Sequence, residues 1–188
     1  LSSHELNQPG CYRDVTDTTV VAQFKTLPET LPDFLQGLGD IHILAWTTTP
    51  WTLPSNTALT VGPKITYALV KTYNQYTFEP VNVILAKALI EKQFAGKFFA
   101  VESEEQLASF QSSDKKIPYF IVKDFIGTDL VGIRYEQLLP YALPYQNPEN
   151  AFRVITGNFV TTEDGTGVVH TAPTFGADDA KVAKEASP

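Results

Sequence analysis

The chain has 188 residues, of which 43% are hydrophobic, so it can bury a full-sized core and is not a disordered protein. Lys and Arg number 14 and Asp and Glu number 21, which gives a net charge of −7. A domain that grips nucleic acid by its phosphate backbone is expected to be basic, so this charge argues against strong autonomous binding of nucleic acid.

The cysteine count and the ends of the chain suggest its setting. A single cysteine, Cys11, excludes an internal disulfide and fits a reducing compartment. No run is apolar and long enough to span a bilayer, and the start does not resemble a secretory signal. We therefore expect a cytoplasmic protein. Because the chain contains no Met and stops abruptly, we also expect one domain, residues 1–188, cut from a longer protein.

Runs of apolar and β-branched residues predict strands, and Gly and Pro between them predict turns. In chain order, strands are expected at residues 18–26, 41–47, 57–61, 65–71, 81–86, 118–125, 152–156, 158–162 and 167–171. Residues 27–40 hold two prolines and two glycines and are predicted to form a loop.

Three short helices complete the prediction. Residues 86–95 form an apolar, alanine-containing run that ends before Gly96, a typical C-terminal cap. Ser103 opens a capping-box pattern for a helix through Phe110. Residues 177–186 carry two acids in their first turn, where they suit the helix dipole. With mostly consecutive strands, this pattern predicts a β-rich α+β fold with a β-barrel or sandwich core and short peripheral helices.

The first segment of chemical interest is WTTTPWTLPSNTA, residues 46–58. Three consecutive threonines end a predicted strand, and Pro50 removes a backbone donor, so the sheet ladder should stop there. The exposed hydroxyls and free backbone groups suit a polar ligand. The alternative is an ordinary threonine-rich strand end with Trp46 and Trp51 in the core, which composition alone favours.

The second segment is GTGVVHTAPTFGADDA, residues 165–180. His170 ends a predicted strand, a loop follows, and Asp178 and Asp179 open a helix. An acid at this position can bind an ammonium group of a ligand. The alternatives are that Asp178 caps the helix, that Asp179 complements its dipole, and that His170 is a satisfied core histidine.

Other chemistries fit the sequence poorly. One Cys and three His without paired spacing argue against a zinc site. The sequence has neither a glycine-rich phosphate loop nor a GxSxG nucleophile elbow.

Together the two segments resemble the editing domain inserted into isoleucyl-tRNA synthetases, which are class I aminoacyl-tRNA synthetases. Weaker matches frame them at residues 12–15, 130–136 and 139–141, so the resemblance covers nearly the whole chain. Valyl and leucyl relatives usually carry Thr-Thr-Arg-Pro where this chain has Thr48-Thr49-Pro50 after Thr47. The shared fold of these three editing domains is a β-barrel surrounded by helices, in agreement with the strand prediction.

The resemblance also implies roles for the residues. Asp179 would hold the α-ammonium group of the substrate. The threonines and Asn56 would position the ester, the adenosine end or the attacking water, and Trp46 would support the wall. His170 would block isoleucine, with a role as general base as the alternative. The expected catalytic residues are Thr48, Thr49, His170 and Asp179, and the expected substrate-binding residues are Trp46, Thr47, Thr48, Thr49, Asn56, His170 and Asp179.

The implied activity is hydrolysis of valine wrongly attached to the isoleucine tRNA, and of valyl-adenylate. The expected partners are the 3′ end of that tRNA, valine or valyl-adenylate, and the rest of the synthetase chain, in a monomer with no membrane contact. No metal or cofactor is expected in this domain, because ATP, and any zinc ion, would belong to the rest of the parent enzyme. Two alternatives stay open: a noncatalytic module that binds the acceptor end of RNA, and a freestanding deacylase.

Overall fold

The computed structural model describes residue 16 and residues 18–186. Within this part of the chain, the strands are β1 (Val20–Lys25), β2 (Ile41–Thr47), β3 (Ala58–Val61), β4 (Thr66–Tyr73), β5 (Pro80–Ala86), β6 (Phe98–Ala100), β7 (Ile117–Ile126), β8 (Arg153–Thr156) and β9 (Val168–Thr171). The α-helices are α2 (Ile90–Gln93), α3 (Glu104–Ala108) and α4 (Ala177–Ala186). The 3-10 turns are η1 (Pro28–Thr30), η2 (Asp33–Leu35), η3 (Pro50–Ser55), η4 (Lys87–Leu89), η5 (Gly127–Leu130) and η6 (Pro148–Asn150).

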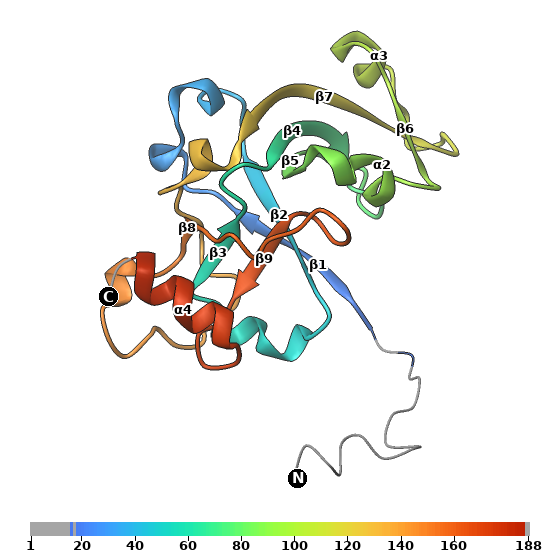
Figure 1. Ribbon diagram of the computed structural model, residues 1–188. Helices are drawn as coiled ribbons and strands as arrows, with labels where there is room; N and C mark the ends of the chain where they lie inside the picture. Colours follow the sequence, from blue (N-terminus) through green and yellow to red (C-terminus); the bar gives the residue numbers. More distant parts are fainter. Residues whose placement is uncertain (1–15, 17, 187–188) are drawn as a thin grey trace.

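The strands form one mixed sheet in which β2 connects two parts. The hydrogen-bonded order is β6-β7-β4-β5-β2-β9-β3-β8, and β1 pairs antiparallel with β2. The first residues of β2 pair with β5, whereas Trp46 near its end pairs with Val169 of β9. In Figure 1, β4 to β7 with α2 and α3 therefore lie on one side, and β3, β8, β9 and α4 lie on the other.

The predicted β-rich α+β class with short peripheral helices is confirmed, but the strands do not close into a complete barrel. Among the described residues, β6 and β8 end the path of the sheet without pairing with each other. Residues 132–136 cross the opening between β8 and β1 with backbone hydrogen bonds to both sides and two isolated bridges. These bridges join Arg134 to Arg153 and Tyr135 to Thr26. The core is thus an open, strongly curved sheet.

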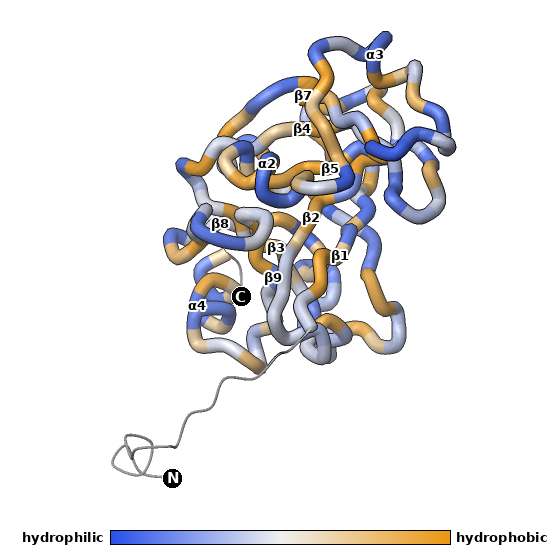
Figure 2. Tube along the Cα trace, turned by 90° about the vertical axis from the view of Figure 1, so that its right-hand side faces the viewer, coloured by the Kyte–Doolittle hydropathy of each residue, from blue (hydrophilic) through white to orange (hydrophobic). Residues whose placement is uncertain are grey.

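The core explains why β2 is apolar along most of its length. Successive side chains of a strand point to opposite faces. Ile43 lies in the larger core cluster, with Phe24 and Leu59, whereas Leu44 lies in a second cluster with Val70. Both faces of β2 are therefore buried. Figure 2 shows the corresponding apolar runs along β2, β4, β5 and β7.

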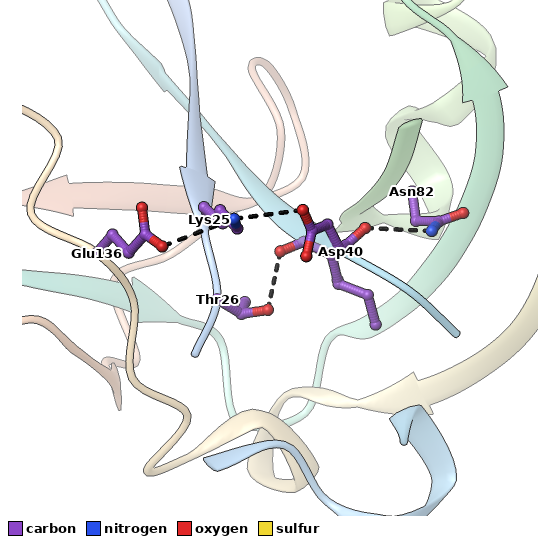
Figure 3. A network of polar contacts seen from close by, with 6 residues as sticks. Lys25, Thr26, Asp40, Asn82 and Glu136 are labelled. Carbon is purple, nitrogen blue, oxygen red and sulfur yellow. Dashed lines mark hydrogen bonds and ion pairs between the residues drawn. The ribbon is translucent and has the colours of Figure 1, made fainter. Parts of the chain in front are cut away.

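Polar contacts hold the beginning of β2 in place. Lys25 of β1 lies between Asp40 and Glu136, at 3.3 and 3.7 Å from their carboxylates (Figure 3). The Thr26 hydroxyl donates to the carbonyl of Ile41 at 2.8 Å, and the Asn82 amide of β5 donates to the carbonyl of Asp40 at 3.1 Å. The ion pairs are exposed and contribute little, so the bonds from the Thr26 and Asn82 side chains to the backbone carry most of this anchoring.

Most predicted elements are confirmed within two residues of their expected bounds, with two exceptions. Residues 158–162 are not a strand, because Phe159 packs beside α4 against Ile155 and Val182 and the backbone turns there. Residues 86–95 are only partly α-helical. Ala86 still belongs to β5, and η4 precedes α2. The short strand β6 was not predicted.

The capping prediction for Ser103 is confirmed in part. Its hydroxyl accepts a bond from the backbone N–H of Gln106 at 3.3 Å, while the Gln106 side chain accepts from Glu102. The weak match at residues 12–15 and Cys11 lie outside the described residues. In residues 18–186, no helix combines the length and apolar character needed to cross a membrane.

Candidate functional site

The threonines after β2 form a tight hydrogen-bonded turn. Thr47 is buried, and its hydroxyl accepts from the backbone N–H of Thr49 at 3.0 Å. Pro50 then begins η3, since a proline has no N–H to continue the ladder. Thr48 is the exposed member of the three, whereas Thr49 is partly buried. The turn therefore presents Thr48 at the surface and directs the other hydroxyls inward.

Strand β9 places His170 beside the threonine turn. Trp46 and Val169 are paired in parallel, so Thr47 and His170 are the next residues along their strands and face the same side of the sheet. On the other edge of β9, His170 pairs with Leu59 of β3. The two segments, more than a hundred residues apart in sequence, thus meet at one end of the sheet.

The His170 ring is enclosed by polar partners. Its side chain is only 7% exposed. Nε2 lies 2.8 Å from the hydroxyl of Thr52, and Nδ1 lies 3.0 Å from the amide nitrogen of Asn56. Burial lowers the pKa of His170, and the nearby carboxylate of Asp179 offsets part of this effect. The ring is therefore neutral at pH 7, with both nitrogens already hydrogen bonded.

Asp179 reaches this group from α4. The helix begins at Ala177, and Asp179 folds back so that its Oδ2 accepts the backbone N–H of Ala172 at 2.8 Å. The side chain is partly buried, and its charge acts on His170. Asp178 is exposed beside it. The Asp179 carboxylate thus faces the end of β9, whereas that of Asp178 is exposed. The Oδ1 of Asp179 takes no part in the bond to Ala172.

Asn56 connects the histidine to an adjoining cavity. Its amide nitrogen also donates to the carbonyl of Ala58 at 2.9 Å, and its oxygen accepts the hydroxyl of Tyr135 at 2.6 Å. A cavity of about 370 Å³ opens next to it. Its lining is Pro54, Ser55, Asn56, Thr57, Gln137, Ala142, Leu143, Pro144, Tyr145, Phe152, Pro173 and Thr174. Residues 54–57 of the first segment and 173–174 of the second therefore line one opening.

Trp46 is the one expected site residue that the structure places elsewhere. It points to the face opposite Thr47 and packs on Gly165, whose added Cβ would lie 2.8 Å from its ring. There it lines a separate cavity with Val169 and Phe159. Across residues 18–186, no group of three or more His, Cys, Asp or Glu side chains is placed to hold a metal ion.

Comparison with known proteins shows which family the chain resembles. No family model matches the chain. The isoleucine–tRNA ligase of Bacteroides fragilis is 59% identical over 186 residues, which cover 99% of this chain and 16% of that protein. The ligase of Cytophaga hutchinsonii is 58% identical over 185 residues, and that of Clostridium tetani is 41% identical over 185 residues. Each of these two matches covers 98% of this chain, and they cover 16% and 14% of the respective ligases.

Solved structures show the same fold. The editing domain of the P. knowlesi cytosolic leucyl-tRNA synthetase superimposes with a TM-score of 0.56 at 13% identity, over 86% of this chain and 60% of that one. The structure of GlLeuRS-CP1 gives 0.56 at 14% identity, over 90% and 64%. The chain belongs to the family of isoleucyl-tRNA synthetase editing domains. This editing domain spans about a sixth of the length of the ligases that it matches.

Two residues that hydrogen bond with His170 or Asn56 in this editing domain were not expected from the sequence. Thr52 lies inside the first segment, and its position two residues after Pro50 in a turn was the available signal. Tyr135 lies in the weaker match at residues 130–136, and no local pattern distinguishes it from a core tyrosine. Both became visible only through their contacts with His170 and Asn56.

Proposed function

We propose that this editing domain hydrolyses the ester that links wrongly attached valine to the isoleucine tRNA. The observation that carries the proposal is the meeting of the threonine turn, His170 and Asp179 at one end of β2 and β9. Such a site has a carboxylate for an ammonium group, hydroxyls for a polar ester and a rigid neutral ring beside them.

The chemistry of the two amino acids explains why such an activity is needed. Valine and isoleucine differ by one methylene, which an apolar pocket distinguishes by about 1–3 kcal/mol, a limit for which isoleucyl-tRNA synthetase is itself the standard illustration. A second site that admits valine and rejects isoleucine supplies the missing discrimination. In this proposal His170 fills the space that the extra methylene of isoleucine would occupy.

The reaction needs no covalent intermediate. A water oxygen attacks the ester carbonyl carbon, the bond to the ribose oxygen breaks, and that oxygen leaves with a proton. The products are free valine and uncharged tRNA. Positioning of the water and stabilisation of the developing negative charge supply the rate enhancement. We assign the ammonium to Asp179 and the ester and water to Thr48 and Thr49. Since both ring nitrogens of His170 are engaged, the general base is not assigned to it.

The proposal extends to the partners of the domain. The substrates are the 3′ end of valyl-tRNA for isoleucine and valyl-adenylate, and the domain works within a longer, monomeric synthetase chain in the cytoplasm. It needs no cofactor of its own, because ATP chemistry belongs to the rest of that enzyme. Isoleucine activation and tRNA selection are likewise assigned to the remaining five sixths of the relatives' length.

A deacylation assay tests the proposal directly. The 188-residue chain should release valine from the mischarged isoleucine tRNA, and Asp179→Ala should lose most of that activity because no other carboxylate takes the ammonium group. The matched control is Asp178→Asn, which alters the exposed neighbour in the same helical turn and should keep the activity. A chain that binds the tRNA but leaves the ester intact is a binding module, and full activity in Asp179→Ala refutes the assignment of the site.

A further inference from the structure

The buried hydroxyl of Thr52 connects the threonine turn to His170. It donates to the carbonyl of Thr49 at 2.8 Å, so its lone pairs remain free to accept. His170 Nε2 lies 2.8 Å away, and the Thr49 hydroxyl lies 3.3 Å away. Thr52 is only 6% exposed. It therefore contacts residues at the site while having almost no surface of its own for a ligand.

The other side of the ring is fixed by Asn56 and Tyr135. The carbonyl of Ala58 can only accept, so the Asn56 atom facing it at 2.9 Å is the amide nitrogen. The same nitrogen faces His170 Nδ1 at 3.0 Å, which must then be the unprotonated nitrogen. Tyr135 completes the arrangement by donating to the Asn56 oxygen at 2.6 Å. The buried amide thus has each of its polar atoms satisfied.

These contacts select one state of the histidine. A neutral imidazole with an accepting Nδ1 carries its proton on Nε2, and that proton points at Thr52. Transfer of the proton to Nδ1 would place two donors against each other at Asn56. A flip of the ring would put Cδ2–H in the place of Nδ1 and leave the Asn56 amide without its acceptor. The ring is therefore locked in orientation and tautomer by two residues, one on each side.

We propose that Thr52 and Tyr135 are positioning residues that hold His170 in one orientation and so set the selectivity of the site against isoleucine. The proposal rests on the proposed function, in which His170 is the excluding side chain. Neither residue acts on the substrate directly. Removing either hydroxyl should therefore change the choice between the two esters more than the rate with valine.

Kinetics of variants at Thr52, with a control variant at Thr72, test the effect on selectivity. Thr52→Val keeps the side-chain shape but leaves the His170 N–H without an acceptor, and it should lower the valine-to-isoleucine ratio of kcat/KM about tenfold. Thr52→Ser keeps the hydroxyl and should restore the ratio. Thr72→Val is the control. It removes another buried hydroxyl, bonded to the carbonyl of Pro118 at 2.9 Å in the other half of the sheet, and should leave the ratio unchanged.

Side-chain NMR of ¹⁵N-labelled histidine tests the locking independently of catalysis. His170, assigned with His170→Gln, should show a protonated Nε2 and an unprotonated Nδ1, and its Nε2–H should exchange slowly with water. Thr52→Val should speed that exchange, and Tyr135→Phe, which frees the Asn56 amide, should broaden or shift the ring signals. If Thr52→Val does not fold, Tyr135→Phe carries both measurements.

The outcomes separate this inference from the function on which it rests. A wild-type chain without activity on the valine ester refutes the proposed function, while the NMR spectra still decide whether Thr52 and Tyr135 hold the ring. An active chain whose ester ratio survives Thr52→Val and Tyr135→Phe overturns the inference and leaves the function standing. A ring signal with Nδ1 protonated overturns it as well.

Discussion

His170 is the residue to which we assign the selectivity of the proposed reaction. Its ring is buried beside the threonine turn and is held by Thr52 and Asn56. We expect His170→Ala to open space for about one more methylene, so that the isoleucine ester becomes a substrate. Rates of release of both amino acids from the isoleucine tRNA measure this change. Continued rejection of isoleucine by the variant would show that another side chain excludes it.

Burial of two histidines also predicts how stability depends on pH. Burial lowers the pKa of His170 and of His42, more than Asp179 and Asp40 respectively raise it. In the unfolded chain both titrate near pH 6.5, so below that value the unfolded state binds protons that the folded state does not. The free energy of unfolding should therefore be constant above about pH 7.5 and fall as the pH drops toward 5.5.

Urea unfolding at pH 7.5, 6.5 and 5.5 checks this prediction. His42→Gln and His170→Gln should each flatten the dependence on pH, although the second variant also loses stability at every pH through its broken hydrogen bonds. A double variant with the wild-type slope would show that the histidines are not its cause.

At the scale of elements, the start of β9 is the most demanding turn of the site. Gly167 has a φ of +71°, and a Cβ there would lie 2.4 Å from the Cβ of Ala86. Its carbonyl also accepts the hydroxyl of Tyr67 at 2.5 Å, and burial raises the pKa of Tyr67 to about 12, which keeps this donor protonated. The turn places β9, and with it His170, against β5 and β2.

Gly167→Ala should therefore be severely destabilising. The left-handed backbone costs about 1–2 kcal/mol for an alanine, and the clash with Ala86 adds about 1–3 kcal/mol. Gly37→Ala is the matched control, because Gly37 has a similar φ of +73° but open space where its Cβ would lie. Denaturant unfolding of both variants measures the difference. Equal losses of stability would mean that packing against Ala86 does not constrain this turn.

The sequence predicts these elements well where local chemistry decides them. The seven residues of β2 and the ten of α4 lie where an apolar run and an acidic first turn place them. Where packing decides, prediction fails. Phe159 has strand propensity but packs beside α4 against Val182, and β6 forms because β7 offers it a partner. Propensity cannot distinguish a residue that pairs from one that only packs.

In the site, too, local sequence predicts some features and long-range packing decides the others. The threonines, His170 and Asp179 can be named from their two segments, but the parallel pairing of Trp46 with Val169 joins strands far apart in sequence. No local pattern contains that pairing. It decides that His170 faces Thr47 and that Trp46 faces the opposite side, against Gly165. Thr52 and Tyr135 escape prediction for the same reason, because their roles are defined by partners more than seventy residues away.

At the scale of the whole molecule, the net charge of −7 limits how the domain meets RNA. Affinity that comes from neutralised phosphates falls with salt in proportion to the number of contacts. A protein that contacts six to ten phosphates loses about 10³–10⁵ in affinity between 50 and 200 mM salt. In the proposed function this acidic domain receives only the 3′ end of the tRNA. It should then contact about two phosphates, for which the corresponding loss in affinity is about sevenfold with a single strand.

We therefore expect kcat/KM of the 188-residue chain for valyl-tRNA to fall less than about tenfold between 50 and 200 mM KCl. The matched substrate is valyl-adenosine, which keeps the ester and the ammonium group but has no phosphate, and its kcat/KM should not change. A loss of a hundredfold or more with the tRNA alone would mean that the domain grips the phosphate backbone despite its charge. Tight recognition of the tRNA would then lie in this domain, and the division of labour with the rest of the synthetase would have to be redrawn.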